Sequence, residues 1–177
     1  MVSLTSSESV DVVSENDETL YVTSLEDCKR NGLLHRCVSI FLLNSDGELL
    51  LQRRSLQDDW LPGKWTVSST GHVRAGEIPW HASIRELKEE LGIDAEPKFL
   101  FKLVLPRISW SEFTEYELAY AFEASTDMDI VIEPLEVEQV KFLPISDCRA
   151  IVQDHREDFT PDAVVLLKLY LDRAERQ

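Results

Sequence analysis

Residues 71–93 of this 177-residue chain are GHVRAGEIPWHASIRELKEELGI. Pro79 suits the first turn of a helix, and Gly92 suits the position just after the last turn. The segment therefore predicts a helix over about 79–91. A short strand, TVSSTGHV at 66–73, and a glycine-containing loop come before this helix.

The predicted helix has one apolar face and one acidic face, as its spacing at about 100° per residue shows. The apolar face, which we expect to point at a core, carries Ile84, Leu87 and Leu91. The opposite face carries Glu86, Glu89 and Glu90.

Three carboxylates on one helix face are unfavourable by local rules. Like charges at these spacings repel by roughly a few tenths of a kcal/mol each, and the helix dipole disfavours anions in the last turn. Lys88 and Arg85 offset only part of this cost. A bound Mg²⁺ or Mn²⁺ would favour the cluster, because both ions take oxygen ligands. The alternative is a solvated acidic face in an acidic protein.

The length and composition predict one globular domain. The chain is 44% hydrophobic and 29% charged, close to averages for soluble proteins. We expect residues 1–7 to be a disordered tail and residues 8–177 to form a single domain. No run of about 18 apolar residues is present, and the first residues lack the pattern of a signal peptide.

The cysteine count indicates the cellular compartment, and the net charge indicates which classes of partner the protein can bind. Three cysteines cannot form a disulfide framework, which favours a reducing, cytoplasmic location. The 18 basic and 33 acidic residues give a net charge of −15, which repels nucleic-acid polymers and anionic membranes. A small phosphorylated ligand remains compatible with this charge if a divalent cation lies between it and the carboxylates.

The other predicted elements alternate between strands and helices. Two hairpins are expected, at 9–24 and at 37–54, and the second turns at Ser45-Asp46-Gly47. Further strands are predicted at 97–106, 117–125 and 137–144, with a polar link at 29–36. We expect Ser146 to cap a short helix that runs to about 153. The last helix begins at Thr160-Pro161-Asp162, and its core positions are Val165, Leu166, Leu169 and Leu171. The pattern is that of a single mixed α/β domain.

Segment 71–93 as a whole resembles the Nudix box, and it fills every position of that motif. The matching residues are Gly71, Glu77, Arg85, Glu86, Leu87, Glu89, Glu90, Gly92 and Ile93. The sequence is therefore identified as similar to the Nudix hydrolase superfamily. The resemblance implies an α/β/α sandwich with a mixed β-sheet and a strand–loop–helix that binds Mg²⁺ or Mn²⁺.

The resemblance also implies roles for single residues. The metal ligands would be the carboxylates of Glu86, Glu89 and Glu90 and the backbone carbonyl of Gly71. Arg85 would orient a glutamate, and Glu77 would support the loop or the metal. The implied reaction is the attack of water on a diphosphate phosphorus in a small-molecule substrate. Many members of the superfamily form dimers, so a homodimer stays open.

A second resemblance, over roughly residues 28–125, is to the type 1 isopentenyl-diphosphate isomerase branch of the same superfamily. That branch holds a metal with three histidines and two glutamates. The positions here that would form this second metal site are Cys28, His35, His72, Glu115 and Glu117. By spacing alone, Glu115 and Glu117 lie on one face of a strand. The alternative is a set of half-buried histidines beside an acidic strand edge.

Two departures from this branch argue against isomerase activity. Thr70 stands where the branch has a catalytic cysteine, and a hydroxyl is a far weaker proton donor or acceptor than a thiol. Asp58 and Asp59 stand where basic residues would hold the diphosphate. The complete box favours hydrolysis, and the alternatives are an isomerase with a relocated acid and a catalytically silent binding module.

Candidates for substrate binding lie outside the box. Arg53, Arg54 and Lys64 could reach a phosphate, because guanidinium and ammonium groups suit that contact. Trp110 could stack on a base or cover an isoprenoid chain, although packing is the ordinary role of a tryptophan. Candidates for the general base are Glu112, Glu136 and Glu138.

Overall fold

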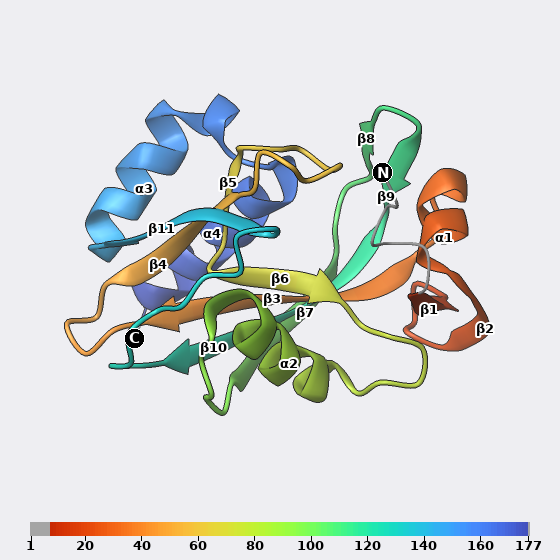
Figure 1. The fold of residues 1–177 in the computed structure, drawn as a ribbon, viewed down its shortest axis with the longest axis horizontal. Coiled ribbons are helices and arrows are strands. Elements are labelled where there is room, and N and C mark those ends of the chain that lie inside the picture. The colour runs from red at the N-terminus through yellow and green to blue at the C-terminus, as the bar shows by residue number, and fades with distance from the viewer. Residues whose placement is uncertain (1–7, 177) are drawn as a thin grey trace.

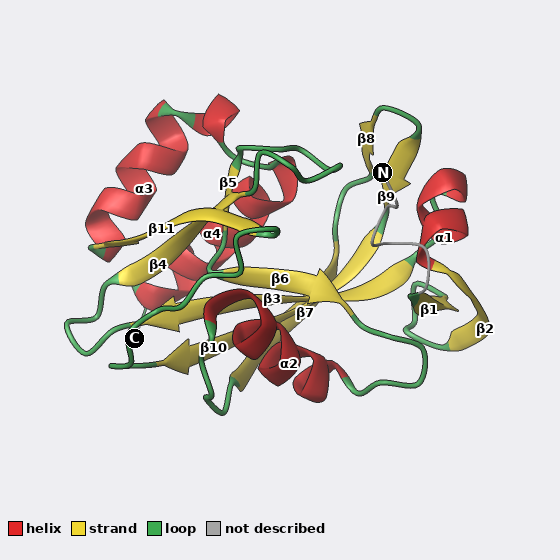
Figure 2. Cartoon of the chain, viewed as in Figure 1, coloured by secondary structure: helices red, strands yellow, loops and turns green. Residues whose placement is uncertain are grey.

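The computed structural model describes residues 8–176, so the predicted tail at 1–7 lies outside the described residues. The chain folds as a mixed α/β domain in which a large sheet is covered by helices on both faces (Figures 1 and 2). The helices are α1 (Leu25–Asn31), α2 (Pro79–Leu91), α3 (Ile145–Asp154) and α4 (Pro161–Ala174). A 3₁₀ turn (Arg156–Asp158) precedes α4.

The strands form a nine-stranded sheet and a separate two-stranded sheet. The large sheet contains β1 (Ser9–Val13), β2 (Thr19–Ser24), β3 (His35–Leu43), β4 (Leu49–Arg54), β5 (Trp65–Thr66), β6 (Ser69–His72), β7 (Lys98–Val104), β10 (Glu117–Ser125) and β11 (Val137–Leu143). The small sheet is the hairpin of β8 (Ile108–Trp110) and β9 (Phe113–Glu115).

Strand β3 is the centre of the sheet, since β1, β4, β6 and β10 all pair with it. It runs parallel to β10 over nine residue pairs, from Glu117↔His35 onward. It runs antiparallel to β6, where Cys37 pairs with His72. These two ladders bring the first residues of β3 and β10 beside the last residue of β6. The sheet therefore gathers three chemically active side chains at one end.

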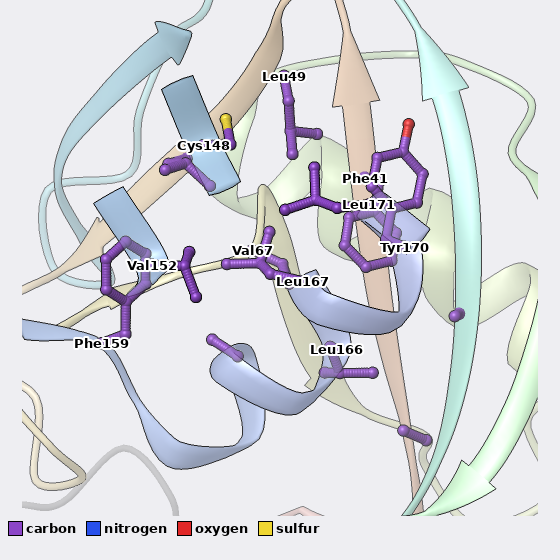
Figure 3. Packing of buried hydrophobic residues seen from close by; sticks show 14 of the residues in the cluster. Phe41, Leu49, Val67, Cys148, Val152, Phe159, Leu166, Leu167, Tyr170 and Leu171 are labelled. Atoms are coloured by element: carbon purple, nitrogen blue, oxygen red, sulfur yellow. The ribbon is translucent and has the colours of Figure 1, made fainter. Parts of the chain in front are cut away.

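The alternation of β3 builds a core on each face of the sheet. Val38, Ile40 and Leu42 pack with the buried face of α2. Phe41 packs on the other side with α3 and α4, where its ring stacks on Tyr170 with centroids 4.0 Å apart (Figure 3). The two cores fix α2 against one face of the sheet and α3 and α4 against the other.

Most of the predicted elements are present, and helix α2 has the predicted bounds. Three details differ. Leu169 is 42% exposed and is not a core position; the buried stripe of α4 contains Leu166, Leu167, Tyr170 and Leu171. Helix α3 begins after Pro144 with no side-chain cap, so the predicted cap at Ser146 is wrong. Ile84 is only partly buried.

Two features of the structure, helix α1 and the hairpin β8–β9, were not predicted from the sequence. Helix α1 occupies the residues before the predicted link and its first part, 29–31; Ser24 caps the helix by accepting a hydrogen bond from the Asp27 amide, and Gly32 ends it with φ 56°. The hairpin β8–β9 lies between the predicted strands at 97–106 and 117–125, and it contacts α1. Among the described residues, no helix has the length and apolar character needed to cross a membrane.

Candidate active site

Arg85 organises the acidic face of α2. Its guanidinium donates to both carboxylate oxygens of Glu77, at 2.9 Å each, and to the backbone carbonyl of His72 at 2.9 Å. It also donates to Glu86 and, at 3.1 Å, to Glu89. One half-buried side chain thus ties the loop, strand β6 and the helix together, and its expected role in orienting a metal ligand stays a prediction.

Gly71 makes room for the carboxylate of Glu86. A Cβ atom at position 71 would lie 2.0 Å from Cδ of Glu86, far inside van der Waals contact. Glu86 itself is only 7% exposed. Burial raises the pKa of Glu86 well above its usual range, and the charge of Glu90 adds to the effect. The glycine is required here by the close approach of an acid side chain.

Glu90 and Glu136 complete the cluster around Glu86. One carboxylate oxygen from each of the three lies within 4.8 Å of the others. Burial raises the pKa of Glu90 to about 7, and Glu136 adds to the effect, while the nearby Ser69 hydroxyl and the hydrogen bond from the Thr70 amide oppose it. Two buried carboxylates and one exposed carboxylate that converge in this way fit a hard divalent cation, which would relieve their repulsion.

Glu89 lies at the rim of this cluster. Its side chain is 45% exposed, and it contacts Arg85 and Arg74. The group of three instead includes Glu136, which precedes β11 and was expected only as one of several candidate bases. No box pattern marks Glu136, because the fold brings it to the helix from 46 positions beyond Glu90 (136 − 90).

A second cluster lies at the end of the sheet where β3, β6 and β10 meet. His35, His72, Glu115 and Glu117 each offer one ligand atom within 4.8 Å of the others. Nε2 of His35 lies 3.4 Å from Oε2 of Glu115, and Nε2 of His72 lies 3.6 Å from Oε1 of Glu115 and 3.8 Å from Oε1 of Glu117. Glu115 ends β9 and Glu117 begins β10, so both carboxylates reach one site although a strand break separates them.

The second cluster also fits a metal ion. Nε2 of His35 and Oε2 of Glu115 are buried and lack a hydrogen-bond partner among the described residues. The other ring nitrogen of His35 lies 3.0 Å from the carbonyl oxygen of Leu33, which orients the ring. Cys28 is not in the group: its thiol is buried and lies 3.4 Å from the same carbonyl. Four of the five predicted ligands are therefore brought together.

The charges in this cluster are strongly coupled. Burial would raise the pKa of Glu115, but the imidazoles of His35 and His72 and the charge of Lys29 outweigh it and hold this pKa well below its usual range. Burial raises the pKa of Glu117 to about 8, and the negative Glu115 adds to the effect. One carboxylate is thus held ionised and its neighbour is held protonated at neutral pH.

Lys29, on α1, is a member of this cluster that sequence reasoning missed. Its ammonium nitrogen lies 2.6 Å from Oε1 of Glu115. The only available signal was its place beside Cys28, because a seven-residue helix carries little periodicity.

The predicted phosphate-binding residues mostly contact the loop at 55–64. Nε of Arg53 donates to the carbonyl of Gly63 at 3.0 Å, and Arg54 donates to the carbonyl of Trp60 and to Asp58. The positive charge of Arg54 also lowers the pKa of Glu90. Lys64 donates to the carbonyl of Glu157, away from both clusters.

Three predicted site residues lie outside both clusters. They are Trp110, the candidate for stacking on substrate, and the two remaining candidate bases, Glu112 and Glu138. Trp110 is 43% exposed at the turn of β8–β9. Glu112 pairs with Arg30 on α1, and Glu138 is exposed on β11.

The fold and these clusters define an α/β protein that presents a glutamate-rich helix and an adjoining histidine–glutamate cluster, two candidate sites for divalent cations. The chain belongs to the Nudix family, since the family model described as "NUDIX domain" matches residues 33–163.

Curated relatives include proteins named as isomerases and one named as an uncharacterized Nudix hydrolase. The chain is 35% identical over 157 residues to isopentenyl-diphosphate Delta-isomerase 1 of Photorhabdus laumondii, covering 87% of this chain and 89% of the relative. It is 32% identical over 169 residues to an uncharacterized Nudix hydrolase of Pseudomonas aeruginosa, covering 90% and 91%. The crystal structure of DR0079 from Deinococcus radiodurans superposes with a TM-score of 0.75 at 23% identity, covering 91% of this chain and 98% of that one, which supports the fold.

Proposed function

We propose that this protein is a Mg²⁺- or Mn²⁺-dependent hydrolase that cleaves the diphosphate linkage of a small organic or nucleoside diphosphate compound. The observation that carries the proposal is the cluster of Glu86, Glu90 and Glu136, held in place by Arg85 and accommodated by Gly71. The family relationship supports hydrolysis as the type of reaction.

The residues of the chain would divide the work as follows. Glu86 and Glu90 would bind the ion, and Glu89 would join them from the rim. A divalent ion held there would activate water and neutralise charge on the diphosphate oxygens. Arg85 aims the carboxylate of Glu86 at the cluster and opposes the rise in its pKa, and Glu77 holds Arg85 by a two-point contact. Glu136, the most exposed of the three clustered carboxylates, is placed to accept a proton from the attacking water.

Arg54 is the candidate for contact with the substrate phosphates. Its charge lowers the pKa of Glu90, on α2, and of Asp162, in the first turn of α4. Its hydrogen bond to Asp58 keeps the guanidinium oriented while the side chain stays 19% exposed.

Isomerisation of isopentenyl diphosphate is the second candidate function. The relatives named as isomerases and the cluster of His35, His72, Glu115 and Glu117 favour it. Thr70 counts against it, since the position before Gly71 carries a hydroxyl where that chemistry needs a thiol. The third candidate function is that of a catalytically silent binding module, which would bind metal and ligand without turnover.

One assay separates these functions. The protein is incubated with Mg²⁺ or Mn²⁺ and with isopentenyl diphosphate or a panel of nucleoside and sugar diphosphates, and the products are separated by mass and retention. We expect a cleaved phosphoanhydride, with turnover lost in Glu90→Gln. The matched control Glu96→Gln changes an exposed glutamate with no assigned role in the site and should retain turnover. Isomerised product without phosphate release would overturn the proposal, and so would undiminished hydrolysis by Glu90→Gln.

A further inference from the structure

The ammonium group of Lys29 occupies a defined place in the histidine–glutamate cluster. Its nitrogen lies 2.6 Å from Oε1 of Glu115, and the two side chains are only 13% and 5% exposed. Most lysines lie on the surface and keep their charge in water. A lysine that turns its charge inward to a buried carboxylate is positioned by its surroundings.

Two aromatic rings fix this position. The ammonium lies 5.1 Å from the ring centroid of Trp60 and 5.8 Å from that of Phe113. Both distances are within the range of cation–π attraction. Trp60 is 8% exposed, so the loop at 55–64 covers the lysine. The arrangement draws on α1, β9 and this loop at once.

Lys29 and a metal ion would require the same carboxylate. Glu115 is the ionised acid of the cluster and faces both His35 and His72. A divalent ion bound by these imidazoles and Glu115 would lie beside the ammonium, in a site where burial strengthens repulsion between like charges. The acidic cluster at Glu90 differs, because there Arg85 contacts Glu86, and among the described residues no basic side chain forms an ion pair with Glu90 or Glu136.

We propose that Lys29 is a built-in counter-cation of the histidine–glutamate cluster, and that it competes with divalent metal for Glu115. The acidic cluster on α2 then fills with metal first, and the histidine–glutamate cluster stays charge-balanced without an ion. The proposal concerns metal affinity and rests on the geometry of this cluster, so it stands apart from the proposed hydrolase activity.

Cobalt(II) titration of the full-length protein tests the competition. Nitrogen ligation by imidazole gives Co²⁺ a visible spectrum that differs from that of an oxygen-only site, so the two clusters are read separately. In Lys29→Met the charge is removed and an apolar chain remains against Trp60 and Phe113. We expect this variant to gain the histidine-type spectrum and to bind Co²⁺ there at least about tenfold more tightly than wild type.

Three variants make the result specific. Lys29→Arg keeps the positive charge and should bind as weakly as wild type. Lys102→Met removes a lysine from another close ion pair, with Asp17 at 2.7 Å, and should leave the spectrum unchanged. Adding His35→Gln to Lys29→Met should abolish the new spectrum. If Lys29→Met fails to fold, Lys29→Gln provides the same test with a neutral donor.

Several outcomes would overturn the proposal. Equal or weaker Co²⁺ binding in Lys29→Met would show that Lys29 orients Glu115 for the metal instead of competing with it. The absence of a histidine-type spectrum in every variant would show that some other feature prevents metal binding. If Lys102→Met gained the same Co²⁺ affinity, the effect would come from the net charge of the protein and not from the position of Lys29.

Discussion

The carboxylate of Glu86 lies in the space that a side chain at Gly71 would occupy, with only 2.0 Å between Cδ of Glu86 and the position of a Cβ. Glu86 comes from the middle of α2 and Gly71 from strand β6, and the loop between them is braced by Arg85 and Glu77. The two residues are one structural unit, in which the missing side chain of one sets the position of the acid of the other.

Gly71→Ala should therefore displace Glu86 and weaken metal binding together with stability. We expect a loss of about 1–3 kcal/mol in the free energy of unfolding, the usual cost of an overpacked interior. Urea unfolding and Mg²⁺ titration measure the two effects. In a Glu86→Ala background the clash is gone, so Gly71→Ala should cost almost nothing there. Equal costs in both backgrounds would contradict this explanation of the glycine.

Arg85→Lys should preserve the positive charge but lose the hydrogen-bond geometry of the guanidinium group. A lysine cannot make the two-point contact with Glu77 while also reaching the carbonyl of His72 and the carboxylate of Glu86. We expect turnover to fall by about 10–100-fold, as for other residues that orient metal ligands. The free energy of unfolding should fall by about 1–3 kcal/mol. Steady-state kinetics and thermal unfolding check this, and unchanged turnover would exclude an orienting role.

The metal-free protein should lose stability as the pH rises toward neutral. The pKa of Glu90 is about 7 in the fold against an ordinary 4.5, so the folded state holds a proton that the unfolded state releases. This contribution is complete below pH 4.5 and is lost as the pH passes 7, on the order of a few kcal/mol. Urea unfolding in EDTA at pH 5 and 8 measures it.

Glu90→Gln is the control for this pH dependence, because it removes the titrating group. The wild type should lose more stability than the variant between pH 5 and 8. Mg²⁺ should reverse the wild-type loss, since the ion binds the ionised carboxylate, and its affinity should increase over the same interval. Identical pH profiles for the two proteins would show that Glu90 does not titrate in this range.

Trp110→Ala tests the exposed tryptophan of the β8–β9 turn. The side chain is 43% exposed, so its removal should change the free energy of unfolding by no more than about 0.5 kcal/mol. If the ring stacks on the substrate, KM should rise several-fold with kcat unchanged. Trp80→Ala is the matched control: Trp80 is 38% exposed and donates to the carbonyl of Pro97, so its loss should affect stability and leave KM alone.

The parts of the fold that could be predicted are those with local signals. Pro79 and Gly92 bracket α2 because their backbone preferences act within one turn, and the structure confirms both ends. The buried face of α4 was predicted to include Leu169, but this side chain is exposed. An apolar residue at the edge of a buried face is buried only if a neighbouring element covers it. Helix α1 is too short for periodicity, and its capping by Ser24 was the signal that could have revealed it.

The candidate site divides in the same way. The acids of α2 follow from spacing along one helix, whereas Glu136 joins them through the pairing of β11 with β4. His35, His72, Glu115 and Glu117 were singled out by resemblance, and the structure brings these four together. Lys29 could not be foreseen, because its contact with Glu115 spans 86 positions (115 − 29) and depends on the docking of α1 beside the small hairpin.

Strand β6 has a consequence for how such a protein can diverge. Thr70 donates its amide to Glu90, Gly71 admits Glu86, and His72 offers its carbonyl to Arg85 and its ring to the second cluster. Three successive residues of β6 thus contact the two clusters. A substitution that shifts this strand should therefore change the geometry of both clusters. The side chain at position 70 is the exception, since the bond to Glu90 uses the backbone. Selection can exchange that one side chain and alter the chemistry while the scaffold on either side stays intact.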